Sequence, residues 1–204
     1  MGNVDNQIKE IIDGTPDILK NYIEATRSKS AIKKTSESLK RDILKKVESA
    51  INKLYEDDMI LLTDQMNEVT ICGRLAIYLH DLFRDYLGYY IDIEYYRLRR
   101  PKNEANLRED RIRCDILLHS RGTYERRVDN LLAIEVKLEN NHDDGSSDRK
   151  RLAEFVLPEI SDTPANAVHS TLIGLFLRIG ITGYSSVLLT SREYIKKQSN
   201  INKK

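Results

Sequence analysis

The hydrophobic pattern of this chain changes its period once, at Gly88, and that change most constrains the fold. Before it, apolar residues recur every three or four positions over 31–55 and 62–87, which is typical of amphipathic helices. After it, apolar and polar residues alternate from Ile91 to Tyr96, which predicts a strand. Glycine commonly follows the last turn of a helix, so Gly88 is the expected helix end. The sequence therefore predicts helices first and a sheet second.

The pattern after this first strand indicates an α/β fold. A nearly continuous apolar run over 171–179 is typical of a strand that is buried on both faces. The expected elements are, in order, strands over 111–119 and 131–138, a short helix that Ser147 could cap and that ends before Pro158, the buried strand over 171–179, and a last strand over 186–190. A mixed sheet with helices follows from this order.

The expected domain organisation has three parts. Residues 1–57 form a helical extension, residues 58–195 form the α/β domain, and the Lys/Asn-rich residues 196–204 form a disordered tail. The helix over 31–55 leaves three roles open: a dimer seam, a support for the α/β domain, or a lysine-rich clamp on a nucleic-acid backbone.

Composition indicates a globular chain with a heavily charged surface. Hydrophobic residues make up 40% and charged residues 32% of the 204 positions. No apolar run of about 18 residues and no basic-then-apolar leader is present, so we expect a cytoplasmic protein without a membrane partner. Cys72 and Cys114 lie in apolar stretches and are expected to be reduced, buried thiols.

The distribution of charge is more informative than the net charge of +1. Lysines and arginines concentrate over 29–53 and 97–113, whereas acids concentrate over 135–148. An acidic pole between basic segments suits a polyanion that is held against a metal site. The simpler interpretation of each segment is a solvated charged face.

Strand alternation brings three reactive side chains to one face. Over 111–119 and 131–138 the apolar residues fall at even positions, so Asp115, Glu135 and Lys137 point to the opposite side. Two carboxylates at one place repel each other unless a cation lies between them, and Mg²⁺ prefers such oxygen ligands. A lysine nearby can orient the attacking water and steady developing phosphate charge.

Glu68 adds a carboxylate from the preceding helix. It lies four, seven and eleven positions before Cys72, Leu75 and Leu79, at the end of the core-facing stripe. A solvated glutamate is not usually placed there, since burying its charge is costly. A metal-bound water or a basic partner near the sheet would offset that cost.

These residues resemble the motif of the PD-(D/E)XK nuclease superfamily. The resembling motif is Cys114-Asp115 followed by Glu135-Val136-Lys137, with Glu68 on the preceding helix, and Cys114 stands where the motif's name has proline. The segment Asn67-Glu68-Val69-Thr70 and those around Arg113 and Asp148 are also similar to a group of uncharacterised bacterial members. The resemblance covers roughly residues 58–190 and implies a restriction-endonuclease-like core: a helix, a three-stranded meander, a helix and further strands.

The resemblance also implies a function and a set of roles. Asp115, Glu135 and the backbone carbonyl of Val136 would bind Mg²⁺ or Mn²⁺, Glu68 would bind it through water, and Lys137 would be the catalytic lysine. The expected activity is metal-dependent hydrolysis of phosphodiester bonds by an endonuclease, with DNA expected before RNA.

Five further residues are candidate substrate contacts. For His119 the alternative is an exposed histidine at a strand end, and for the segment after Asp148 it is compensation of a helix dipole. These candidates are Arg97, Arg113, His119, Arg149 and Lys150.

Two rival functions remain open. The first is a nucleic-acid-binding module of the same fold that has lost turnover. The second is an oligomerisation or partner-binding protein that acts through residues 1–57, for example as a homodimer joined by the N-terminal helices. Intact Asp115, Glu135 and Lys137 favour the enzyme, since an idle site has no reason to retain repelling carboxylates.

Overall fold

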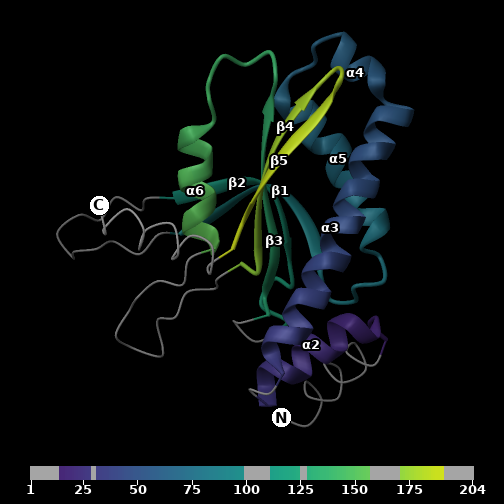
Figure 1. Cartoon of the computed structure of the whole chain (residues 1–204), viewed down its shortest axis with the longest axis vertical. Coiled ribbons are helices and arrows are strands. Elements are labelled where there is room, and N and C mark those ends of the chain that lie inside the picture. The colour runs from purple at the N-terminus through teal and green to yellow at the C-terminus, as the bar shows by residue number, and fades with distance from the viewer. Residues whose placement is uncertain (1–13, 29–30, 99–110, 125–127, 157–170, 191–204) are drawn as a thin grey trace, which may run out of the picture.

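A mixed five-stranded sheet lies between helix α6 on one face and helices α3 and α5 on the other (Figure 1). The computed structural model describes residues 14–28, 31–98, 111–124, 128–156 and 171–190. The helices are α2 (Asp17–Ser28), α3 (Ile32–Asp57), α4 (Met59–Thr63), α5 (Glu68–Leu82) and α6 (Ser146–Val156). The strands are β1 (Tyr90–Leu98), β2 (Arg111–His119), β3 (Asn130–Leu138), β4 (Ile173–Gly180) and β5 (Gly183–Leu189). The expected α/β class behind N-terminal helices is therefore confirmed.

The strands lie in the sheet in their chain order. The pairs β1–β2, β2–β3 and β4–β5 are antiparallel, whereas β3 and β4 are parallel. A parallel pair needs a crossover connection, and the segment that contains α6 makes it. β3 therefore lies at the centre of the sheet, where both of its faces are covered.

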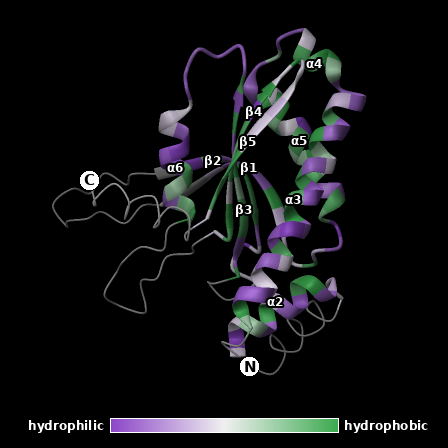
Figure 2. Cartoon of the chain, in the orientation of Figure 1, coloured by the Kyte–Doolittle hydropathy of each residue, from purple (hydrophilic) through white to green (hydrophobic). Residues whose placement is uncertain are grey.

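The core has two parts, one on each face of the sheet. On the α3 and α5 face, Ile134 and Val136 of β3 join the larger apolar cluster. On the α6 face, Ala133 packs with Leu152 and Phe155 in a smaller one. Figure 2 shows that the hydrophobic residues of α3 and α5 turn toward the sheet. Burial on both faces explains the continuous apolar runs of β3 and β4.

Helix α3 rests on this core. Its predicted stripe is buried, and it belongs to the same cluster as residues of α5 and the sheet; its members are Leu39, Ile43, Val47, Ala50 and Leu54. The hydroxyl of Tyr86 donates to Asp42 over 2.6 Å, and that of Tyr55 donates to the carbonyl of Gly180 over 2.8 Å. Three roles were left open for this helix. Within one chain, its apolar stripe is buried against the α/β domain, so the helix supports that domain.

The helix expected over 62–87 is shorter than predicted. Helix α5 begins at Glu68 because the side chain of Asn67 caps it, accepting from the amide of Thr70 over 2.9 Å. The preceding Gln65 has a left-handed φ of 53°, which separates α4 from α5. After Leu82 the chain turns and the helix does not continue, and the rings of Phe83, Tyr86 and Tyr89 pack edge to face. Gly88 has φ 78°, so it lies in a turn several residues after the helix end.

Other predicted boundaries shift by a few residues or cannot be compared. Strand β5 begins at Gly183, three residues before the expected start, and α6 begins at Ser146 instead of after a cap at Ser147. The predicted tail over 196–204 lies outside the described residues. None of the described helices is both long and apolar enough to cross a membrane.

Replacing Leu54 by alanine tests whether α3 belongs to the core. Leu54 is fully buried, so we expect Leu54→Ala to lower the free energy of unfolding by about 2–5 kcal/mol, the usual cost of truncating a buried leucine. Urea denaturation followed by circular dichroism measures this change. Asn52→Ala, on the exposed side of the same helix, is the control and should change it by no more than about 0.5 kcal/mol. Equal effects of the two substitutions would contradict the packing.

Candidate active site

Strands β2 and β3 separate where the acidic residues lie. The last recorded pair between them is Ile116 with Ile134. Beyond that pair, β2 continues alongside β1 and β3 continues alongside β4. Asp115 and Glu135 are the next residues on the two strands, so they lie at the start of a fork in the sheet. A fork exposes backbone groups that a continuous ladder would occupy.

The carboxylate of Asp115 bridges the fork. Its Oδ2 accepts a hydrogen bond of 2.7 Å from the backbone amide of Val136, so β2 and β3 remain tied beyond their last pair. Asp115 is only 6% exposed. Burial raises the pKa of its carboxyl, although the Val136 amide and the charge of Arg113 act against that rise.

The expected alternation along β2 fails at Asp115. Cys114 packs with Leu117 on the α6 side, whereas Ile116 faces α3 and α5, so Cys114 and Ile116 do not share a face as predicted. Glu94 lies opposite Asp115 on β1 and has a left-handed φ of 51°. An irregularity of this kind rotates the side chains on either side of it. The left-handed residue is on β1, and the recorded β1–β2 pairs pass over Glu94 and Asp115, so the ladder is interrupted where the side chains of β2 change face.

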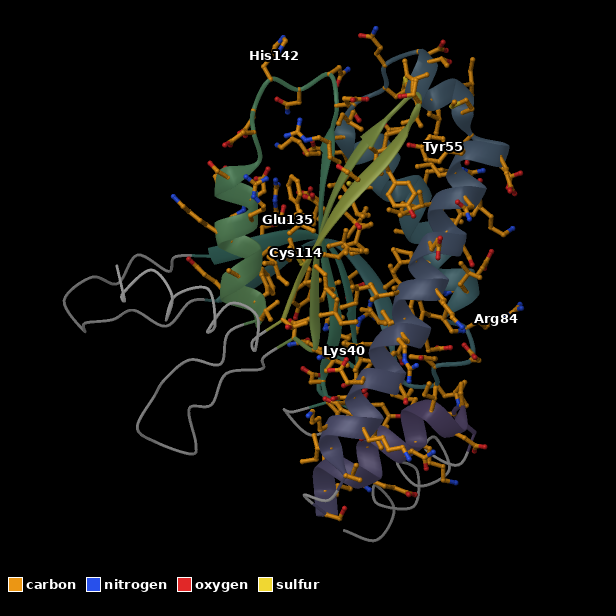
Figure 3. The ribbon with its side chains drawn as sticks, in the orientation of Figure 1. Lys40, Tyr55, Arg84, Cys114, Glu135 and His142 are labelled. Carbon is orange, nitrogen blue, oxygen red and sulfur yellow. The ribbon has the colours of Figure 1, made fainter. Side chains whose placement is uncertain are left out.

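Glu135 is buried between the sheet and α6 (Figure 3). Glu135 is 1% exposed, and its Oε2 lies 3.3 Å from Nη2 of Arg151. Its Oε1 has no hydrogen-bond partner within the described part of the chain. Burial and then the charge of Asp115 raise the pKa of Glu135 to about 8, against the opposing effect of Arg151. A buried carboxylate oxygen without a partner is costly, and a cation would relieve that cost.

Lys137 is surrounded by acids. Its Nζ lies 3.0 Å from Asp148, 3.8 Å from Asp143 and 3.9 Å from Glu68. Burial alone would lower the pKa of Lys137, but the hydrogen bond with Asp148 and the charge of Glu68 outweigh it and raise the pKa. Lys137 is therefore an ammonium ion whose position is set by three carboxylates.

Glu68 reaches this group from the opposite layer. It is the first residue of α5, and the backbone of Leu138 forms a hydrogen bond with its carboxylate. Burial raises its pKa, and the charge of Lys137 partly offsets that rise. Cys72, one turn further along α5, has a thiol whose pKa is raised by burial and then by Asp115 and Glu68. The predicted convergence of α5 with the two strands is thus present around Lys137.

Two residues of α6 belong to this group and were not predicted as site residues. Arg151 donates both to Asp148 and to Glu135, so it links α6 to the sheet. Asp148 was interpreted only as an acid at a helix start, yet its side chain is buried against Lys137. The signal was available: Asp148 and Arg151 are three residues apart, on the same helical face as the buried Leu152.

His119 lies apart from the acidic group. Its Nε2 is 2.7 Å from Asp92, and its ring packs edge-on against Tyr95. Asp92 also pairs with Arg121, so these residues form a separate polar cluster. His119 is at the opposite end of β2 from the fork and is buried, which differs from the exposed strand end considered above.

The basic candidates whose side chains the structure describes are Arg113, Arg149 and Lys150. Arg113 pairs with Glu94. Arg149 donates to the carbonyl of Asp144 over 2.9 Å and lies 5.1 Å from the ring centre of Phe176. Lys150 is exposed on α6. Arg97 lies in β1 opposite Ile112, and its side chain is outside the described part of the structure.

The acidic group fits a divalent cation. Within the described ranges, no three His, Cys, Asp or Glu side chains form a ready-made metal site. Mg²⁺ usually keeps several waters and takes only one or two carboxylates from the protein, so Asp115 and Glu135 suffice. Apart from the exposed Asp143, the group contains four carboxylates and the two basic side chains of Lys137 and Arg151. Its net charge is −2 when all of them are ionised. A charge of +2 at the unpartnered oxygen of Glu135 would neutralise it.

No protein-family model, no curated protein and no solved structure matches this chain. The chemistry of the site is therefore inferred from the contacts of its own side chains. These side chains are Glu68, Asp115, Glu135, Lys137, Asp148 and Arg151.

Glu135→Gln is expected to stabilise the metal-free protein at alkaline pH. The pKa of Glu135 rises from 4.5 to about 8 on folding, so between these values the folded state binds more protons than the unfolded state. The free energy of unfolding of the wild type must then fall as pH rises through this window, by an amount on the order of a few kcal/mol. Asp115, Arg151 and Asp148 face this carboxyl, and Asp115 has a raised pKa that adds to the same trend.

The measurement is urea denaturation in EDTA from pH 4 to 9. Glutamine has no charge to bury, so the variant should exceed the wild type in stability near pH 8.5, and the difference should shrink toward pH 4.5. Glu56→Gln, on the exposed side of α3, is the matched control and should leave the profile unchanged. A variant less stable than the wild type throughout would show that Glu135 is held as a well-compensated ion.

Proposed function

We propose that this chain is a divalent-metal-dependent nuclease with a PD-(D/E)XK, restriction-endonuclease-like core. The observation that carries the proposal is the buried Oε1 of Glu135, which has no hydrogen-bond partner among the described residues. It lies at the fork beside Asp115, with Lys137 two residues further along β3. The element order α5, β1–β2–β3, α6, β4 agrees with the order expected for that core. Support for the activity comes from the chemistry of this group, since no matching relative supplies it.

The proposed metal ligands are on the two strands of the fork. Asp115, Glu135 and the carbonyl of Val136 would hold Mg²⁺ or Mn²⁺, with Glu68 acting through water. When bound, the ion would polarise the scissile phosphate and lower the pKa of a water molecule. Hard oxygen donors of this kind suit Mg²⁺ or Mn²⁺ better than a soft metal.

The residues of the chain position the reacting groups. Lys137 is a buried ammonium held by Asp148, so it is oriented before substrate arrives. It would donate hydrogen bonds to the attacking water or to a phosphate oxygen and stabilise the charge that develops there. Arg151 donates a hydrogen bond to Oε2 of Glu135, whereas Oε1 has no hydrogen-bond partner among the described residues. Arg113, Arg149 and Lys150 would contact the nucleic-acid backbone, with DNA proposed before RNA.

Cleavage assays with Lys137→Ala test the activity. The wild type should cut one or more of supercoiled plasmid, single-stranded DNA and RNA with Mg²⁺ or Mn²⁺, and EDTA should abolish cutting. Lys137→Ala should lower the rate by at least about 100-fold, as loss of an electrostatic or proton-transfer group does. Lys45→Ala, an exposed lysine of α3, removes the same charge and should retain full activity. Salt-sensitive binding without cleavage, unaffected by metal, would instead indicate an inactive binding module.

Metal binding can be measured without turnover. A ligand at 100 times its dissociation constant stabilises the folded state by about 2.7 kcal/mol, so Mn²⁺ should raise the midpoint of thermal unfolding. Asp115→Asn and Glu135→Gln should lose this shift because each removes a proposed ligand. Asp81→Asn, on the exposed end of α5, should retain it. A shift of equal size in all three variants would place metal binding elsewhere and contradict the proposed ligands.

A further inference from the structure

A cavity of about 360 Å³ opens beside the candidate active site. It lies between α4 and the turn that joins β4 to β5, at the end of the sheet near Tyr55 (Figure 3). Its volume is within the range of small-molecule sites, roughly 300–1,000 Å³. The metal site and the catalytic lysine proposed above do not use this cavity.

The cavity and the active site share a strand end. Leu138 lines the cavity and directly follows Lys137 on β3. The backbone of Leu138 also forms a hydrogen bond with the carboxylate of Glu68, and Oε2 of Glu68 lies 3.9 Å from Nζ of Lys137. Leu138 packs on the α3 and α5 face of β3, whereas Lys137 contacts Asp148 of α6, so the cavity and the lysine lie on the two faces of the same strand end and Glu68 connects them.

The cavity is lined by apolar residues and by polar residues, of which one is an acid. The apolar lining residues are Leu62, Met66, Leu138, Ile179 and Ile181. The polar groups include the amides of Gln65 and Asn140 and the carboxylate of Glu139. A cavity that combines apolar side chains with a few hydrogen-bonding groups suits a heterocyclic base, whose faces are apolar and whose edge is polar.

Glu139 is the one charged residue of the cavity lining, and it is exposed. Its carboxylate lies against the backbone of Gly180, where an added Cβ would be only 1.8 Å from Oε2, so the absence of a side chain at Gly180 makes room for it. A carboxylate repels phosphate, and it accepts hydrogen bonds from an amine. Glutamate and aspartate pair with the exocyclic amine of cytosine in this way.

From these contacts, we propose that the cavity binds one unstacked nucleobase carrying an exocyclic amine, adjacent to the phosphate at the active site. The inference rests on the proposed nuclease function and specifies its substrate as a strand with an accessible base. Cytosine, adenine and guanine each carry an exocyclic amine that can donate to Glu139, whereas thymine and uracil present a carbonyl where the amine is needed.

Methionine NMR tests the proposal on the intact chain without metal or turnover. The chain has three methionines, of which Met66 lines the cavity. With methyl-¹³C methionine, deoxycytidine monophosphate should shift the Met66 resonance upfield in a saturable manner, because a base ring stacks over it. Thymidine monophosphate should bind about tenfold more weakly, and Glu139→Gln should remove most of that difference. Deoxyribose 5-phosphate, which has no base, should leave the resonance unmoved.

Filling the cavity gives a second, independent measurement. Ile181 is 48% exposed in the β4–β5 turn, so Ile181→Trp should fold and occupy the cavity. It should lower cleavage of cytosine-containing single strands about tenfold and abolish the Met66 shift. Ile77→Trp, an equally exposed isoleucine on α5 away from the cavity, is the control.

The outcomes separate this inference from the proposed function. If cleavage depends on Lys137 but no nucleotide shifts the Met66 resonance, the proposed base-binding cavity is overturned and the proposed nuclease activity stands. A shift of equal size with deoxyribose 5-phosphate also overturns it, since the base would not be what is bound. If Ile77→Trp loses cleavage as Ile181→Trp does, the loss does not come from filling the cavity, and the inference is overturned.

Discussion

Negative charge buried at the fork of the sheet is the constraint on which the rest of the structure depends. Asp115 and Glu135 lie where β2 and β3 part, and each is almost fully buried. Asp115 offsets part of its desolvation through the amide of Val136, and Glu135 offsets part through Arg151. One oxygen of Glu135 is not offset within the described residues, so the site stores an unfavourable interaction that a cation can relieve.

This charge also explains how α6 is oriented. Leu152 and Phe155 pack α6 on the sheet, but apolar contacts alone specify the register of a helix weakly. Arg151 must reach Glu135, and Asp148 must reach Lys137. A shift of α6 by one turn would leave buried charges without partners, which costs several kcal/mol. We infer that the apolar side chains of α6 provide most of its binding energy and that its charged side chains determine its position.

The sequence was most informative where a single period dominates. The stripe of α3 and the continuous apolar run of β4 both predicted their elements, because burial on a helix face or on two faces of a strand requires those patterns. It was misleading at Cys114, since strict alternation would separate Cys114 from Leu117, whereas both pack in the cluster on the α6 side. Asp148 was missed because its role depends on Lys137, which is eleven residues away and contacts it only through the fold. The helical face that it shares with Leu152 could have indicated that Asp148 is buried, but not that Lys137 is its partner.

The position of the site agrees with the topology of the sheet. Strands β3 and β4 are parallel, so their carboxyl ends lie at the same edge, where Lys137 and Leu138 meet Ile179 and the β4–β5 turn. In open α/β sheets, ligands bind beyond the carboxyl ends of parallel strands, where connections diverge. Helix α5 also begins at this edge, and the partial positive charge of its N-terminus favours anions such as phosphate there. The acidic group, the N-terminus of α5 and the cavity thus adjoin along one strand end, and the proposals above assign to them the metal, the phosphate and the base of a single nucleotide.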